Sequence, residues 1–133
     1  MSEDIDNQSG LKNHLGIEVH EIARGEVKTS MQVRPFLTAP DGHLHAASVV
    51  ALAIESAGVG CMASLPAEAT GFSTIELKTN HLGSPHAGWI DCRAYAVHMG
   101  RTTQVWDADI THRETGKKIA MLRCTQFLAY PRN

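Results

Sequence analysis

Hydrophobic and polar positions follow two different periods along this chain. Residues 44–65 form one long, largely apolar stretch rich in alanine and glycine, which predicts a single helix that ends at Pro66. On both sides of this stretch the period changes to two, which is typical of strands with one buried face. The predicted strands cover residues 17–23, 26–33, 72–82, 89–98, 101–112 and 118–130.

Turn residues mark the ends of these segments. Gly16 is expected to close a short helical turn over residues 10–16, and Gly58 and Gly60 allow a bend in the long helix. The connections between the later strands are short enough for neighbouring strands to pair as an antiparallel meander. The pattern therefore predicts an α+β fold in which a curved antiparallel sheet wraps around one helix.

Length and composition narrow the class of protein. A chain of 133 residues fits a single domain, expected over residues 11–133 after a flexible tail of residues 1–10. A net charge of −2 argues against nucleic-acid or anionic-membrane partners. Three cysteines without metal-type spacing favour a reduced, cytoplasmic protein over a disulfide scaffold.

The apolar stretch carries one formal charge between Gly42 and Ala67, the carboxylate of Glu55. That charge and the small residues around it favour a core helix over a membrane span of the same length. Holding a carboxylate in apolar surroundings costs several kcal/mol unless it is paired or hydrogen-bonded. We therefore interpret Glu55 as a functional acid; a glutamate facing solvent or pairing with a basic group is the alternative.

Polar residues precede the helix. Asp41 and His43 are candidates for capping its first turn, because side-chain acceptors there satisfy free backbone amides. His43 and His45 alternate, but no further carboxylate or cysteine stands at ligand spacing, so a metal site is not expected. His45 is either a helix-start residue or a substrate contact.

Four stretches together resemble the hotdog-fold acyl-CoA thioesterases, in particular the phenylacetate-pathway and 4-hydroxybenzoyl-CoA thioesterase branch. They are GHLHAAS leading into the helix, TIELKTNHLGSPHAG, AVHMGRTT and GKKIAMLRCTQFLAYP, and the resemblance covers residues 11–131. The resemblance implies a hotdog fold, in which the sheets of two subunits meet edge to edge and each active site lies between subunits. It implies a homodimer or homotetramer that needs no cofactor beyond the coenzyme A of its substrate.

The resemblance places the catalytic acid on Glu55 and the helix-start histidine on His45. The family usually has nine residues from histidine to acid, whereas this chain has ten, so either the loop bulges or Ile54 holds the usual place. The polar residue six before the histidine is replaced by Ala39, which leaves Asp41 as the nearest polar candidate.

The remaining candidates are groups that could act on or contact a thioester substrate. The free amides of Ala46 and Ala47, at a helix N-terminus, suit the oxyanion of a tetrahedral intermediate. Glu55 would act as general base on water or as nucleophile, and a coenzyme A thiolate leaves readily because thiols ionise near a pKa of about 8.5. The candidate substrate contacts are Asp41, Gly42, Ser48, His81, Arg101, Thr102 and Thr103.

Two further functions remain open at this stage. A lyase of the same architecture, an enoyl-CoA hydratase or dehydratase, would act on the Cα–Cβ bond. A non-catalytic acyl-CoA-binding module would lose neither binding nor activity when Glu55 is replaced. Because ten helical residues span about 15 Å, His45 and Glu55 of one chain are expected to serve different sites of a dimer.

Overall fold

The computed structural model describes residues 10–132, so the predicted flexible tail lies outside the described residues except for Gly10. A long helix, α3, and six strands make up most of this part, together with a short helix and one 3-10 turn. Each predicted element is present, with ends within two residues of the prediction. The elements are α2 (Leu11–His14), β1 (Glu18–Ala23), β2 (Glu26–Gln32), η1 (Pro35–Leu37), α3 (Ala46–Ala63), β3 (Gly71–His81), β4 (Trp89–Met99), β5 (Thr103–His112) and β6 (Lys118–Ala129).

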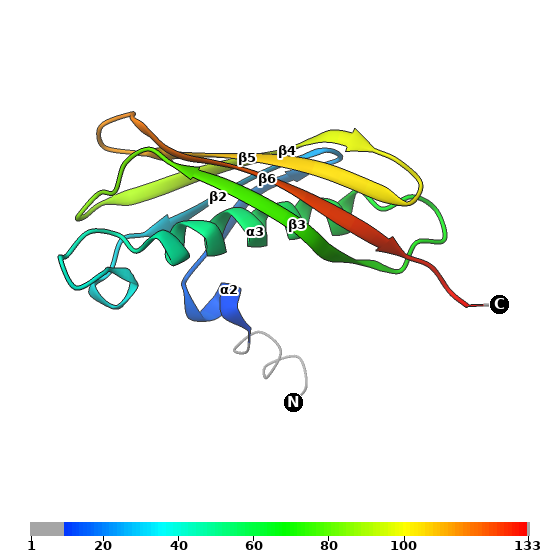
Figure 1. Cartoon of the computed structure of the whole chain (residues 1–133), viewed down its shortest axis with the longest axis horizontal. Coiled ribbons are helices and arrows are strands. Elements are labelled where there is room, and N and C mark those ends of the chain that lie inside the picture. Colours follow the sequence, from blue (N-terminus) through cyan, green and yellow to red (C-terminus); the bar gives the residue numbers. More distant parts are fainter. Residues whose placement is uncertain (1–9, 133) are drawn as a thin grey trace.

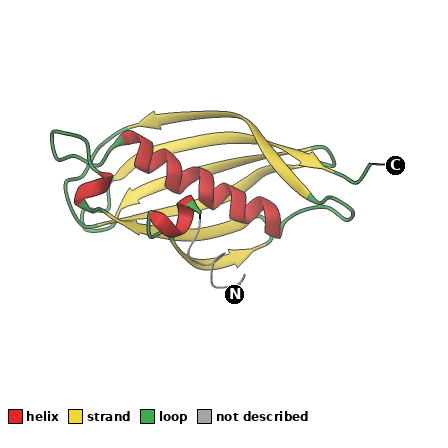
Figure 2. Ribbon diagram, turned by 90° about the horizontal axis from the view of Figure 1, so that it is seen from below, coloured by secondary structure: helices red, strands yellow, loops and turns green. Residues whose placement is uncertain are grey.

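The molecule has two layers. All six strands form one antiparallel sheet in the order β1-β2-β4-β5-β6-β3. Helix α3 lies along one face of this curved sheet, and no helix of residues 10–132 covers the opposite face (Figures 1 and 2). This arrangement confirms the predicted α+β fold with a sheet curved around one helix.

The expected meander is wrong for β3. This strand pairs with β6 at the edge of the sheet rather than with β4, which follows it in the sequence. Residues 82–88 carry the chain past β6 and β5 to β4, which pairs with β2 on its other side. The alternation of apolar positions determines which face of a strand is buried, whereas it carries no information about the neighbouring strand.

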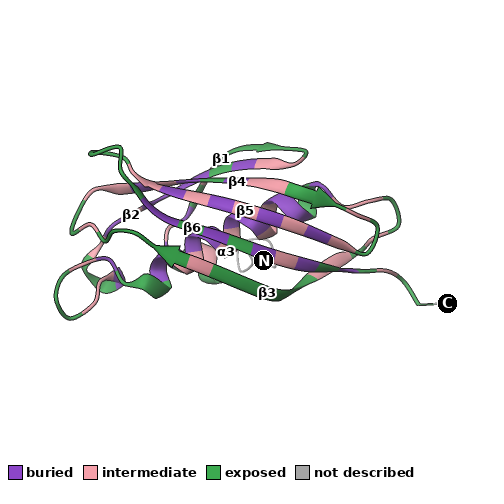
Figure 3. Ribbon diagram, turned by 45° about the horizontal axis from the view of Figure 1, so that its top comes forward, coloured by how far each residue is buried: buried purple, intermediate pink, exposed green. Residues whose placement is uncertain are grey.

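Small residues let α3 approach the sheet closely. A Cβ atom at Gly60 would lie 2.5 Å from Trp106 Cη2, so only glycine fits against this fully buried indole. Buried residues alternate with half-buried ones along β5 and mostly with exposed ones along β6 (Figure 3). The core therefore sits between α3 and the central strands.

Helix α3 runs without interruption through Gly58 and Gly60. Its length and composition alone would let it cross a membrane. Eight of its residues are buried in the domain instead, which fits the predicted core helix: Ser48, Val49, Leu52, Ala53, Ser56, Ala57, Gly60 and Cys61.

Candidate functional site

Glu55 borders a groove on the side of α3 that faces away from the central strands. The groove has a volume of about 520 Å³. We call it the α3 groove; it is lined by Ile54, Glu55, Gly58, Val59, Met62 and Phe72. Glu55 is half-buried there rather than enclosed, because its place on the helix points it away from the sheet.

The Glu55 side chain makes no hydrogen bond or ion pair with any residue from 10 to 132. Every other residue that lines the α3 groove is apolar or glycine. A carboxylate in apolar surroundings is available to a substrate or water, because no protein group competes for it. Glu55 is also the sole carboxylate among the groove-lining residues.

The structure shows how the ten-residue spacing from His45 to Glu55 is accommodated. His45 is the N-cap residue, and α3 is regular from Ala46 onward, with no bulge before Glu55. The position nine residues after His45 is therefore occupied by Ile54, and the acid that the resemblance assigns, Glu55, follows one residue later. Both side chains line the same groove.

His45 caps the helix with its own side chain. Its Nδ1 atom accepts a hydrogen bond from the Ala47 amide at 2.9 Å. Asp41 and His43 do not cap, contrary to prediction, because the loop turns back before the helix begins. Since the Ala47 amide is engaged, Ala46 supplies the free amide: its N–H makes no hydrogen bond with the described residues. This amide lies at the positive end of the helix dipole.

The residues just before the helix form a compact turn. The His43 amide donates to Asp41 Oδ1 at 3.0 Å, and this bond lowers the pKa of the Asp41 carboxyl. Gly42 adopts a φ of 85°, which suits a glycine. The His43 ring lies 3.8 Å from the His86 ring, so His86 and not His81 reaches this turn from the loop after β3.

Two of the predicted substrate contacts, Ser48 and His81, do not line the α3 groove. The Ser48 hydroxyl is buried and donates to the Leu37 carbonyl at 2.9 Å, so it serves the fold and is not free for a substrate. His81 is exposed at the end of β3, where it faces Ala120 of β6. Sequence alone could not separate these cases, because each depends on which loop or strand lies alongside.

Arg101, Thr102 and Thr103 lie near the other end of α3. Arg101 and Thr102 line a depression of about 510 Å³ together with Glu68, Tyr130 and Pro131. The Tyr130 hydroxyl donates to the Arg101 carbonyl, which ties the turn to the end of β6. Thr103 is the first residue of β5.

The predicted site residues of one chain thus fall in three separate places. The helix start, the α3 groove and the Arg101 turn follow one another along α3. About 15 Å of helix separates the residues around Ala46 from Glu55. One chain therefore does not bring the free amide and the carboxylate to a common point.

Comparisons with known proteins agree on the family. Residues 41–119 match the thioesterase superfamily. A 1,4-dihydroxy-2-naphthoyl-CoA hydrolase from Listeria monocytogenes is 35% identical over 116 residues, which cover 87% of this chain and 93% of the relative.

The chain belongs to the thioesterase superfamily.

Solved structures give the same result. A thioesterase from Haemophilus influenzae matches with a TM-score of 0.86 at 26% identity, covering 96% of this chain and 88% of that one. A thioesterase-family protein from Silicibacter pomeroyi matches with a TM-score of 0.84 at 26% identity, covering 97% of this chain and 96% of that one. The predicted hotdog fold is confirmed, and the activity of this thioesterase is thioester hydrolysis.

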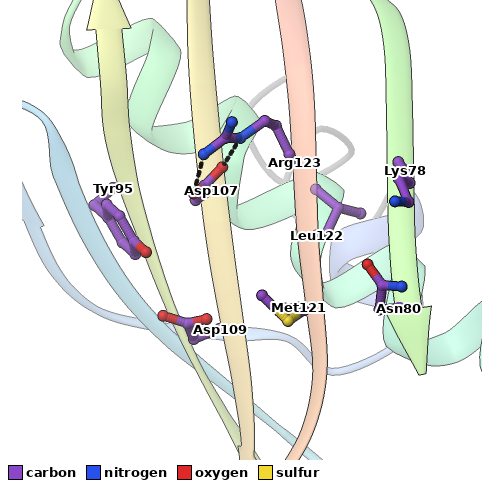
Figure 4. Close-up of a pocket in the computed structure, with 8 residues that line it drawn as sticks. All are labelled: Lys78, Asn80, Tyr95, Asp107, Asp109, Met121, Leu122 and Arg123. Atoms are coloured by element: carbon purple, nitrogen blue, oxygen red, sulfur yellow. Dashed lines mark hydrogen bonds and ion pairs between the residues drawn. The ribbon is translucent and has the colours of Figure 1, made fainter. Parts of the chain in front are cut away.

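A second depression of this thioesterase lies on the outer face of the sheet, remote from the α3 groove (Figure 4). Arg123 spans it and donates to Asp107 at 2.6 and 2.9 Å. Asp109 pairs instead with Lys118, which lies outside the depression, and the depression contains none of the predicted catalytic groups. Its lining residues are Lys78, Asn80, Tyr95, Asp107, Asp109, Met121, Leu122 and Arg123.

Residues 10–132 contain no group of three or more His, Cys, Asp or Glu side chains that could hold a metal ion. The three cysteines are free and buried. Burial raises the pKa of Cys61, Cys92 and Cys124 to about 11 in each case, so these thiols stay protonated at neutral pH. None of them is a suitable nucleophile.

Sequence reasoning missed the wall of the α3 groove. Phe72 pairs with Leu128 near the start of β3 and approaches Gly58, where a Cβ would lie 3.1 Å from the Phe72 ring. Met62, with 53% of its surface exposed, forms another part of the wall. Exposed apolar side chains next to a lone carboxylate would have been the signal, but exposure is not visible in a sequence.

Proposed function

We propose that this protein hydrolyses an acyl-CoA or aryl-CoA thioester to the free acid and coenzyme A, with Glu55 as the catalytic carboxylate. The observation that carries the proposal is the unpartnered Glu55 carboxylate at an otherwise apolar groove. The apolar wall suits an acyl chain or aromatic ring, while the carboxylate stands where the thioester carbonyl would enter. No cofactor beyond the coenzyme A of the substrate is needed.

The chemistry requires one carboxylate and one oxyanion donor. As general base, Glu55 would take a proton from water while the water oxygen attacks the thioester carbonyl carbon. The carbonyl oxygen becomes an oxyanion, which the Ala46 amide would stabilise. Collapse of the intermediate breaks the C–S bond, and the thiolate recovers the proton from Glu55.

Glu55 acting as nucleophile is the alternative route. Its oxygen would attack the carbonyl carbon and expel the thiolate, giving a mixed anhydride that water then hydrolyses. Both routes use the same two groups, and both return the enzyme to its starting state. Hydrolysis in ¹⁸O-labelled water under single-turnover conditions separates them, because only the anhydride route can leave the label in Glu55.

We further propose that two subunits share each site. Strand β3 is an edge strand whose outer side has no partner in the sheet. Ile75 and Leu77 on this strand are 60% and 43% exposed, which is costly for an apolar edge in water. Pairing of two β3 edges would cover them and bring the helix start of one subunit towards Glu55 of its partner.

Arg101 and Thr102 are our candidates for the nucleotide end of coenzyme A. A guanidinium holds a phosphate with two hydrogen bonds, and the depression beside it is open. His45, Asp41, Gly42 and Thr103 stay predictions for the substrate path. Free thiols and a coenzyme A ester as substrate also fit a cytoplasmic enzyme.

A panel of thioesters tests the proposal, with released thiol as the readout. Benzoyl-, hydroxybenzoyl- and dihydroxynaphthoyl-CoA would represent aryl groups, and acetyl- to palmitoyl-CoA would represent alkyl groups. We expect turnover with at least one member of the panel. Enoyl-CoA is included as a control: hydration without thiol release would favour a hydratase, and tight binding without any product would favour a binding module.

A further inference from the structure

The sheet-facing side of α3 carries a buried polar cluster immediately next to Glu55. Thr29 Oγ1 lies 2.6 Å from Ser56 Oγ, and both side chains are inaccessible to solvent. Because Ser56 Oγ also donates to the Leu52 carbonyl at 2.6 Å, its proton is engaged and Thr29 is the donor between the two hydroxyls. Cys92 of β4 lies opposite Thr29 in the pairing of β2 with β4 and is also buried.

The Glu55 carboxylate has no anchor of its own among residues 10–132. Its direction therefore depends on how α3 is rotated about its axis. With side-chain atoms about 6 Å from the axis, a rotation of about 15° would move the carboxylate by about 1.5 Å. A misplacement of about 1 Å at a reacting group can cost about 100-fold in rate.

Apart from the serines, the buried residues of α3 are apolar or glycine and make no side-chain hydrogen bond to the sheet. Two other serines, Ser48 and Ser64, also bond to surrounding elements, but each is eight residues from Ser56. That separation is about 12 Å along the helix. Of these three serine contacts, the Thr29–Ser56 bond is the one in the same helical turn as Glu55.

We propose that Thr29 and Ser56 are positioning residues, whose buried hydrogen bond sets the rotation of α3 and so aims the Glu55 carboxylate into the α3 groove. This inference rests on the proposed role of Glu55. It assigns a function to a polar pair that is buried on the opposite side of the helix from the reacting atoms. The pair would act on the rate of the chemical step and not on substrate affinity.

Thr29→Val tests the proposal, because it keeps the shape of the side chain and removes the hydroxyl. We expect kcat to fall about tenfold or more while KM changes less than about twofold. Thr29→Ser restores the hydroxyl and should restore most of kcat. Ser56→Ala removes the other partner and is well tolerated in a helix, so it should repeat the loss of kcat even if Thr29→Val folds poorly.

Ser64→Ala is the matched control. It also removes a hydrogen bond at the end of α3, the one that the Gly25 amide donates to the hydroxyl of the C-cap residue Ser64 at 2.9 Å, more than two turns beyond Glu55. We expect it to lower the melting temperature and leave kcat unchanged. The proposal is overturned if Thr29→Val and Ser64→Ala have the same kcat as the wild type, or if both lower it equally.

The two proposals fail in different ways. If Glu55→Gln is inactive while Thr29→Val and Ser56→Ala retain full kcat, the positioning role is wrong and the role of Glu55 stands. If Glu55→Gln keeps wild-type activity, the proposed function itself is wrong. A double variant, Thr29→Val with Ser56→Ala, should lose no more kcat than either single variant, since both remove one bond.

Discussion

The two sides of helix α3 use polar residues in opposite ways. On the sheet-facing side, Ser56 and Ser64 are buried and each has a hydrogen-bond partner in the sheet or its turns. On the groove side, Glu55 stands among apolar residues with no partner in residues 10–132. A half-buried carboxylate without a protein partner at an accessible groove is available to a ligand or to water.

The same contrast separates the first two amides of the helix. The Ala47 N–H donates to the His45 cap and contributes to the fold. The Ala46 N–H makes no hydrogen bond with the described residues and is open to solvent. The free amide and the unpaired carboxylate are therefore the two groups that we expect to act on substrate.

Apart from substitutions of Glu55 itself, Ala46→Pro should lower kcat the most among the variants that test this contrast. Proline is favoured at the first position of a helix, and His45 already has an extended backbone with a ψ of 139°, so the fold should be retained. Loss of the N–H should lower kcat by about 10²- to 10³-fold. Steady-state kinetics with a melting curve as the folding control measures this, and an unchanged kcat would remove Ala46 from the mechanism.

Mixed dimers test whether the two open groups come from different subunits. Glu55→Gln and Ala46→Pro subunits are each expected to be nearly inactive alone. A randomly reassociated equimolar mixture should recover about a quarter of wild-type activity, because half of the dimers then contain one intact site. Absence of recovery, with mixed dimers demonstrated by mass spectrometry, would show that a single subunit contains the whole site.

Alanine substitutions at two glycines of α3 test how tightly each side of the helix is packed. Gly60→Ala places a Cβ 2.5 Å from Trp106 Cη2, and we expect about 1–2 kcal/mol of destabilisation after the gain in helix propensity. Gly58→Ala meets the Phe72 ring at 3.1 Å on the groove side, where that side chain has room to move. Its free energy of unfolding should change by less than about 1 kcal/mol. Urea denaturation measures both, and equal losses would contradict the contrast.

The sequence predicted the elements more accurately than their contacts. The phase of Val27, Thr29 and Met31 marked the buried face of β2, and all three are buried. The place of β3 beside β6 was not predictable, because strand periodicity carries no information about neighbours. Asp41 and His43 were the predicted capping residues, whereas His45, which the sequence left open as a helix-start residue or a substrate contact, performs that role.

The candidate site was predicted in part. Glu55 was identified from its charge within an apolar stretch, and the structure places it at the α3 groove. Its neighbours in the groove could not be predicted, since Phe72 reaches Gly58 only through the packing of β3 against α3. The contact between the tilted rings of His43 and His86 depends in the same way on the meeting of two loops.

The turnover of Glu55→Gln tests the central claim most directly. The substitution keeps the size of the side chain and removes the charge, and Glu18→Gln on the exposed edge strand β1 provides a matched control. We predict that kcat falls about 10³-fold for Glu55→Gln at an unchanged melting temperature, and stays at the wild-type value for Glu18→Gln. A Glu55→Gln enzyme within twofold of wild-type kcat would contradict the account.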